Sequence, residues 1–388
     1  MFSERTNWKL AQNRLTEVLE DLRAQGAAVV DLTVSNPTRA GLHYDEQAIL
    51  AALASPQALD YDPQSKGLTE ARQAVAAYYR NEHGVGVEAE RIVLTTSTSE
   101  GYSFVFRLLC NAGDELLVPK PSYPLFEFLA DLQDVKLVPY PLIYDHGWQM
   151  DFPSLERLVT ARTRGIVVVH PNNPTGSFVQ AGEAVQLNSL CRERGLAIIA
   201  DEVFLDYGFE DAPRTSFAGN KEVLTFTLSG LSKIAALPQM KVAWVVTSGP
   251  EAQAAAAIAR LEIIADTYLS MNAPIQWAVP ILLEQRNNIQ RQLLERVRKN
   301  LAELDRQLAK QKACQRLNMQ GGWCVVLRVP VTRSDEELAI ELLRENLVLV
   351  HPGHFYDFPR DGYLILSLIT AEEDFADGIG AVLDRLSS

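Results

Sequence analysis

Residues 165–176, GIVVVHPNNPTG, join a short apolar run to a turn built from asparagine, proline and glycine. A run of this length bounded by turn residues predicts a buried strand. The pattern recurs, and predicts strands at residues 92–96, 115–119, 136–141, 165–170, 197–201, 223–228 and 242–247. The segments between them predict helices at residues 69–82, 99–110 and 181–194. This alternation predicts an α/β fold with a mostly parallel, seven-stranded sheet covered by helices.

The character of the chain changes from about Asn272 onward. A long charged helix is predicted through Gln311, followed by a strand that begins with two glycines and by two further helices. We expect a large domain over residues 45–275 and a smaller α+β domain built from both termini, residues 1–44 and 276–388.

Composition narrows the possible partners. The 388 residues carry a formal net charge of -13, which disfavours binding to a phosphate backbone, so we expect no nucleic-acid partner. The start of the chain is polar, and no apolar run approaches about 18 residues, so we expect a cytoplasmic protein without a membrane anchor. The four cysteines are widely spaced, and His351 and His354 lack a third ligand, so no metal site is predicted.

Lys233 lies in the small-residue segment SGLSK, directly after an apolar strand. A lysine desolvated in this way can present a neutral amine to an aldehyde, although a solvated loop lysine is the commoner case. Asp201 ends another apolar strand in IIADEVF. Its carboxylate can pair with a protonated pyridine nitrogen, or it can cap the following turn. Ligands in such sheets bind beyond the carboxyl ends of the strands, where both residues are expected.

Three further segments that follow predicted strands carry polar side chains. Asn173, in HPNNPTG, offers an amide to a ring hydroxyl or a carboxylate. Residues 96–99 are four consecutive hydroxyl residues at a predicted helix start, which suits a phosphate site or an ordinary N-cap by Ser97 or Thr98. Tyr123, in PKPSYPLF, can stack on an aromatic ring or simply pack in its loop.

The ordered motifs LDYDPQSKGLTEAR, TTSTSEGY, PKPSYPLF, HPNNPTG, ADEVF and SGLSK resemble those of the class I/II aminotransferases. These are the fold-type I pyridoxal-phosphate enzymes, typified by aspartate aminotransferase. The resemblance extends from about Asp31 to the C-terminus, because SNPT, QGGWCVVL and VHPGHFY also match.

The resemblance implies a role for each matching residue. Lys233 would form a Schiff base with pyridoxal 5'-phosphate and then move the proton between the substrate α-carbon and the cofactor. Asp201 would pair with the pyridinium nitrogen, Asn173 would bond the ring hydroxyl, and Tyr123 would stack on the ring. The implied phosphate ligands are Thr98, Ser99, Ser229, Ser232 and Lys241, with Tyr61 reaching the phosphate from the neighbouring subunit of a homodimer.

Three positions depart from the family pattern. Phe204 replaces a tyrosine that donates to the cofactor ring oxygen, and this loss should raise the pKa of the Schiff base. Lys241 replaces an arginine at the phosphate, which keeps the charge but loses the bidentate fork. Ile365, in GYLILSL, stands where the family has the arginine that binds the substrate carboxylate.

A carboxylate without a partner is costly in a partly buried site, so another cation is expected to replace the missing arginine. The candidates are Arg39, which follows Asn36 in the SNPTRAG segment, and Arg360, with His354 as a weaker one. We therefore predict substrate contacts at Asn36, Arg39 and Arg360.

The sequence thus predicts an aminotransferase that moves an amino group between an L-amino acid and a 2-oxo acid. The alternative is a pyridoxal-phosphate-dependent lyase, decarboxylase or oxidase, because the pocket decides the fate of the same intermediate. A ligand-sensing domain of a DNA-binding regulator is disfavoured by the retained Lys233, the acidic charge and the absence of room for a helix-turn-helix module before the first motif.

Overall fold

The computed structural model describes residues 1–8, 10–124, 126–269 and 271–387. Its largest element is an eight-stranded sheet in the order β2-β9-β8-β7-β6-β3-β4-β5. The strands are β2 (Ile92–Thr95), β3 (Glu115–Lys120), β4 (Lys136–Tyr144), β5 (Trp148–Met150), β6 (Thr163–Val169), β7 (Ala197–Asp201), β8 (Thr225–Gly230) and β9 (Ala243–Ser248). All seven predicted strands are present, and β5 is an additional one at the edge.

Strand direction decides where the loops of this sheet meet. β8, β7, β6, β3 and β4 are parallel neighbours, whereas β9 is antiparallel to both β8 and β2. β2 therefore points the same way as β8. The carboxyl ends of β2, β3, β6, β7 and β8 consequently share one edge of the sheet, which is where ligands bind in folds of this kind.

Helices cover both faces of the large sheet. Alternate residues of one strand pack on opposite sides: Val93 joins the cluster under α4 and α9, whereas Ile92 and Leu94 pack with α3 on the other face. Burial on both sides explains why the strands are apolar at consecutive positions. The helices of this part are α2 (Glu46–Ala52), α3 (Thr69–His83), α4 (Thr98–Leu109), α5 (Phe126–Asp131), α6 (Phe152–Leu158), α7 (Ala181–Arg194), α8 (Leu231–Ile234) and α9 (Glu251–Tyr268).

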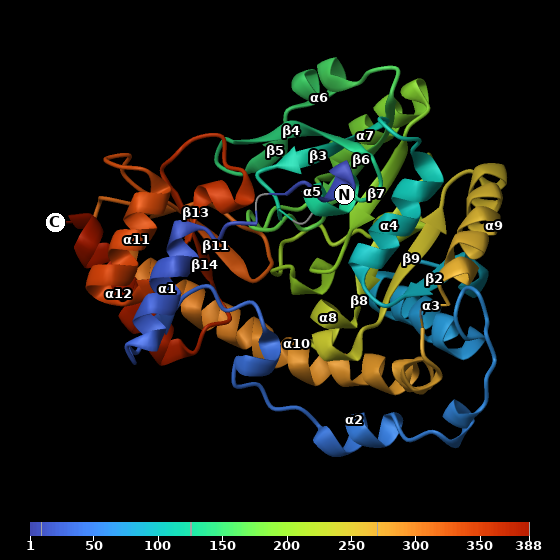
Figure 1. Cartoon of the computed structure of the whole chain (residues 1–388), viewed down its shortest axis with the longest axis horizontal. Helices are drawn as coiled ribbons and strands as arrows, with labels where there is room; N and C mark the ends of the chain where they lie inside the picture. The colour runs from blue at the N-terminus through green and yellow to red at the C-terminus, as the bar shows by residue number, and fades with distance from the viewer. Residues whose placement is uncertain (9, 125, 270, 388) are drawn as a thin grey trace.

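A second, smaller sheet lies at the other end of the molecule (Figure 1). It is antiparallel, in the order β10-β11-β14-β13, and a short parallel pair joins β1 near the N-terminus to β12. The elements are β1 (Val30–Asp31), β10 (Gln315–Arg316), β11 (Cys324–Arg328), β12 (Val348–Leu349), β13 (His351–Pro352), β14 (Tyr363–Ser367), α1 (Arg14–Ala24), α11 (Asp335–Asn346) and α12 (Glu372–Ser387). The N-terminal segment thus contributes a strand to the C-terminal part of the chain.

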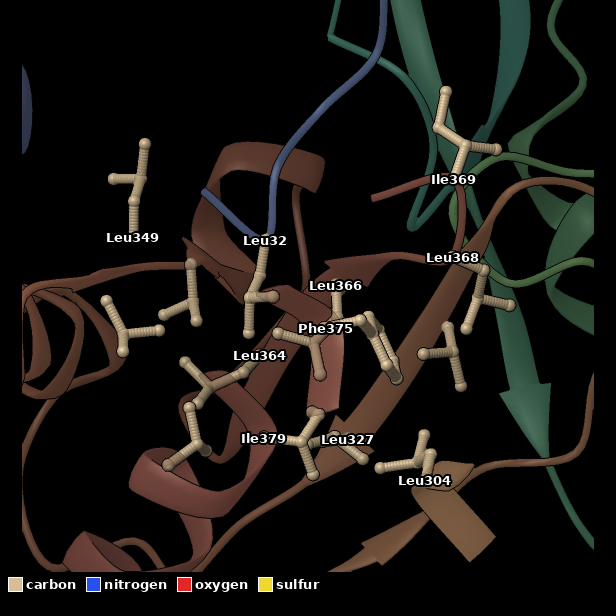
Figure 2. Close-up of a cluster of buried hydrophobic side chains, with 14 of the residues drawn as sticks. Leu32, Leu304, Leu327, Leu349, Leu364, Leu366, Leu368, Ile369, Phe375 and Ile379 are labelled. Carbon is tan, nitrogen blue, oxygen red and sulfur yellow. The ribbon is translucent and has the colours of Figure 1, made fainter. Parts of the chain in front are cut away.

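The small sheet has two different faces. Leu327, Leu364 and Leu366 point into a hydrophobic cluster with Phe375 and Ile379 of α12, as Figure 2 shows. Full burial of a side chain of this size stabilises the fold by about 1.5–3 kcal/mol, so this face anchors the sheet. The alternate residues, on the opposite face, are free to line a site.

The long helix α10 (Ala273–Leu308) passes beneath both sheets (Figure 1). Residues from Ile275 to Leu283 pack with α3 in one cluster, and residues from Ile289 to Leu304 pack with the small sheet in another. The predicted domain boundary at residues 275/276 falls near the start of this continuous helix, and the division into two domains stays a prediction. No helix of the described residues is both long and apolar enough to cross a membrane.

Candidate functional site

A cavity of about 390 Å³ lies where the shared edge of the large sheet meets the small sheet. Five segments at the carboxyl ends of large-sheet strands reach this cavity. The lining residues they contribute are Thr98 after β2, Tyr123 after β3, Asn173 after β6, Asp201 at the end of β7, and Ser232 and Lys233 after β8. Residues far apart in the sequence are therefore brought to one pocket by the parallel topology.

Lys233 belongs to the short helix α8, whose backbone is held by side chains of other elements. The Tyr207 hydroxyl donates to the Lys233 carbonyl (2.7 Å), and Gln290 of α10 donates to the carbonyl of Ile234 (2.8 Å). Gly230 precedes this turn, and a Cβ there would lie 2.7 Å from the Val242 carbonyl oxygen. The position of Lys233 is therefore fixed by contacts that involve its backbone rather than its amine.

The amine of Lys233 lies among aromatic rings. Its Nζ is 5.0 Å from the ring centroid of Trp323 and 5.5 Å from that of Phe204. Burial lowers the pKa of Lys233, and the neighbouring Cys324 and Asp201 act in the opposite direction. A lysine with a lowered pKa supplies more of the neutral amine that attacks an aldehyde.

Asp201 is a buried carboxylate with neutral hydrogen-bond donors. Tyr102 of α4 donates its hydroxyl to Oδ2 (2.9 Å), and the backbone N–H of Val203 donates to Oδ1 (3.1 Å). Burial raises the pKa of Asp201, while the Val203 and Tyr102 hydrogen bonds and the charge of Lys233 lower it. The carboxylate forms no salt bridge within the described part of the chain, so it is suited to pair with a cationic group of a ligand.

The N-terminus of α4 opens onto the same pocket. Ser97 is its N-cap, with the hydroxyl accepting from the backbone N–H of Glu100, so the N-cap interpretation is correct for Ser97. Thr98 at the first helical position lines the pocket, whereas Ser99 is not among the lining residues. A helix N-terminus attracts anions, and capping by Ser97 leaves that property in place.

The HPNNPTG turn presents Asn173 to the pocket and fastens the large sheet to the small one. Asn172 uses its side chain internally, accepting from the Thr175 hydroxyl and donating to the Pro121 carbonyl, while Asn173 lines the cavity. Gly176 has a φ of +68°, and a Cβ there would collide with the carbonyl of Gly321. Only glycine allows this approach, which explains the end of the motif.

One face of the small sheet closes the cavity. Ile365 of β14 is paired with Val326 of β11 on one side and with His351 of β13 on the other. Paired residues of antiparallel strands share a face, as do Cys324 and Ser367 in the neighbouring pair. Four of these residues line the cavity: Cys324, His351, Ile365 and Ser367.

Several predicted site residues lie outside this cavity. Ser229 is buried, and its hydroxyl donates to the Glu202 carbonyl (3.4 Å), while Lys241 is exposed on a left-handed turn. Tyr61 is exposed and lines a separate cavity of about 250 Å³. Cofactor contacts by these three residues stay predictions.

The predicted substrate contacts also lie outside the cavity lining. Asn36 caps a short 3-10 helix, with its carbonyl oxygen accepting from the Thr38 hydroxyl (2.8 Å). Arg39 is exposed, and Arg360 is exposed beside the Tyr363 hydroxyl (3.4 Å). Both arginines are exposed and lie outside the cavity lining, so the replacement of the missing arginine by Arg39 or Arg360 stays a prediction.

The structure adds pocket residues that sequence reasoning did not select: Tyr102, Trp323, Cys324, His351 and Tyr356. Tyr102 lies one helical turn after the hydroxyl-rich helix start, and this spacing is a sequence signal from which it could have been selected. The others depend on which strands of the small sheet are neighbours, and short strands carry little signal of their pairing. Among the described residues, no group of three or more His, Cys, Asp or Glu side chains is placed to hold a metal ion.

The fold and this pocket define a class of protein. The family model described as "Aminotransferase class I and II" matches residues 7–373, and the chain belongs to that family. This confirms the predicted family, fold class and aminotransferase activity, and the family is generally dependent on pyridoxal phosphate.

Particular relatives agree with this assignment. The glutamate-pyruvate aminotransferase AlaA of Haemophilus influenzae is 29% identical over 360 residues, which cover 89% of this chain and 88% of the relative. The alanine aminotransferase of Mycobacterium tuberculosis is 29% identical over 387 residues, covering 95% and 86%. A solved aminotransferase from Escherichia coli matches with a TM-score of 0.88 at 26% identity, over 100% of this chain and 98% of that one.

Proposed function

We propose that this aminotransferase holds pyridoxal 5'-phosphate in the cavity between the two sheets, with Lys233 as its covalent anchor. The observation that supports this most strongly is the convergence of Lys233, Asp201 and the N-terminus of α4 on one pocket. An aldehyde, a protonated pyridine and a phosphate need these three partners: an amine, a carboxylate and an anion-binding helix end.

The buried Asp201 is the best test of the fit. Its carboxylate is inside the protein with a raised pKa and only neutral donors, Tyr102 and Val203, bonded to it. A protonated pyridine nitrogen would supply the missing positive charge, and the ring would remain an electron acceptor. Asn173 and Tyr123 are the candidate partners of the ring oxygen and the ring face.

Phosphate binding is assigned to Thr98 and Ser232, which line the pocket near the start of α4 and in α8. Ser99, Ser229 and Lys241 are expected to contribute less, because they lie outside the lining. The exposed Tyr61 is available to a second copy of the chain, which supports a homodimer in which each subunit completes the other's phosphate site. Four free cysteines suit the reducing conditions of a cytoplasm.

When bound, the cofactor withdraws electrons from the substrate α-carbon and stores the amino group between the two halves of the reaction. The protein's part is proton transfer and water exclusion. The Lys233 amine can accept the substrate α-proton and return it, because its lowered pKa favours the neutral form. The Trp323 and Phe204 rings beside Nζ keep water away from this proton.

The proposed substrates are an L-amino acid and a 2-oxo acid. The relatives whose names mention glutamate, pyruvate and alanine make L-alanine with 2-oxoglutarate the first pair to assay. The test is Lys233→Ala, which should lower transamination by about 10²–10⁴-fold because the acid–base group is lost. Lys221→Ala, at an exposed lysine just before β8, should leave the rate unchanged.

Alanine consumption and ammonia release are measured together. Transamination transfers nitrogen to 2-oxoglutarate without releasing ammonia. A Lys233→Ala protein with full turnover, or a wild-type protein that releases one ammonia for each alanine consumed, would contradict the proposal.

A further inference from the structure

We propose that His351, oriented by Tyr356, binds the substrate α-carboxylate in this enzyme. This inference rests on the proposed function and names the group that selects the substrate in the same pocket. It begins from the charges in the cavity: among its described lining residues, Lys233 is the one lysine or arginine. Since Lys233 serves the cofactor, it is not available as a permanent partner for a substrate carboxylate.

A carboxylate that enters a partly buried pocket without a donor loses its hydration and gains nothing in return. Arg39 and Arg360 do not line the cavity, whereas the lining itself offers a donor. Ile365 contributes only hydrocarbon at the centre of the small-sheet face. Its paired residue on β13 is His351, which shares that face and also lines the cavity.

The environment of His351 orients the ring. Its Nδ1 is 3.2 Å from the Tyr356 hydroxyl, and the ring is flanked by Phe355 and Tyr356 at centroid distances of 5.6 and 5.9 Å. When the Tyr356 hydroxyl donates to Nδ1, the ring proton is placed on Nε2. No hydrogen bond to Nε2 is formed within the described residues, so this N–H is free to donate to a carboxylate oxygen.

Two features make the site specific for a carboxylate rather than for any polar group. Ser35 also lines this cavity, and its side chain is a hydroxyl donor. An arriving carboxylate also favours the protonated ring, so binding strengthens the donor it uses. His351 is thus a specificity-determining residue, and Tyr356 is a positioning residue that acts through it.

The test compares two amino donors that differ only in the carboxylate: L-alanine and ethylamine. Each is mixed with cofactor-loaded enzyme without a 2-oxo acid, and the single-turnover loss of the bound cofactor's absorbance gives a second-order rate constant. His351→Ala should lower the constant for L-alanine by about ten- to one-hundred-fold, the value of a lost hydrogen bond to a charged group. The constant for ethylamine should not change.

Matched variants locate the effect. His351→Gln retains an N–H donor and should recover part of the lost rate, and Tyr356→Phe should lose less than His351→Ala. His354→Ala removes an exposed histidine three residues away, and the double variant Arg39→Ala with Arg360→Ala removes both alternative cations. Both of these controls should retain the wild-type constant for L-alanine.

Equal losses for L-alanine and ethylamine in His351→Ala, or a loss in the double arginine variant instead, would overturn this inference and leave the proposed function intact. A wild-type protein that binds no cofactor would instead contradict the proposed function, and the inference with it.

Discussion

The two sides of the cavity differ in how closely they follow the family. The large-sheet side, defined by Thr98, Asn173, Asp201 and Lys233, carries the hydroxyl, amide, carboxylate and amine that the proposed cofactor site uses, and Phe204 is its departure from the family pattern in the cavity. The small-sheet side, defined by Cys324, His351, Ile365 and Ser367, has an aliphatic residue where the family has an arginine. All members of such a family share the cofactor chemistry, whereas the substrate differs between members. The side that holds the cofactor is therefore expected to vary less than the side that selects the substrate.

The largest expected effect tests the large-sheet side. Asp201→Asn retains acceptor geometry for Tyr102 but removes the charge that would face the pyridinium, so we expect kcat/KM to fall by about a hundredfold or more. The matched control is Glu202→Gln, an adjacent buried carboxyl that accepts from the Ser216 hydroxyl (2.7 Å) and does not line the cavity. Steady-state transamination by both variants is the measurement. Equal losses in the two would mean that the position of the charge does not matter.

The second prediction concerns the pH dependence of folding stability and the part that Glu202 plays in it. Burial raises the pKa of Glu202 to about 7, partly offset by the Ser216 and Phe217 hydrogen bonds. The folded state therefore favours the neutral form of Glu202. The stability that this preference adds to the fold is fully present below about pH 4.5 and is lost as the pH rises through 7. The loss amounts to about 3 kcal/mol.

Urea unfolding at pH 5 and pH 8 measures this effect. Glu202→Gln cannot ionise, so its unfolding free energy should depend less on pH than that of the wild type by about the amount above. Parallel pH profiles for the two proteins would show that Glu202 is ionised in the folded protein at both values.

The smallest expected effect tests the departure nearest to the cofactor. Phe204 lines the cavity and packs against the Trp323 ring at 5.2 Å. Phe204→Tyr would restore a hydroxyl donor to the cofactor ring oxygen, stabilise the unprotonated Schiff base, and lower its pKa by about one unit. Absorbance titration of the loaded enzyme reports this pKa. A value unchanged or raised in Phe204→Tyr would show that position 204 does not reach the ring oxygen.

Local patterns in the sequence were sufficient to predict most of the fold and the large-sheet side. Each strand of the large sheet is a continuous apolar run, and the residue that follows the strand is placed by chain continuity alone. Parallel neighbours then bring Asn173, Asp201 and Lys233 to one edge. The short edge strand β5 was missed because three residues, with only Trp148 and Met150 buried, give too brief an alternation.

The small-sheet side was not predictable in the same way. His351 meets Ile365 through the pairing of a two-residue strand, and nothing in VHPGHFY specifies that partner. Arg39 and Arg360 were reasonable candidates by charge, but charge does not indicate whether a loop residue faces a cavity or solvent. Ser229 is the penultimate residue of β8 and donates to the Glu202 carbonyl, whereas the cavity lining begins with Gly230, so its phosphate contact stays a prediction.

The most direct test of the central claim is to locate the bound cofactor. Loaded enzyme is reduced with borohydride, which fixes the cofactor to its lysine, and digested peptides are examined by mass spectrometry. We predict the pyridoxyl group on the peptide that contains Lys233, both in the wild type and in His351→Ala, and no such adduct in Lys233→Ala. An adduct on another lysine, such as Lys241, or its absence from the wild type, would contradict the assignment of this pocket.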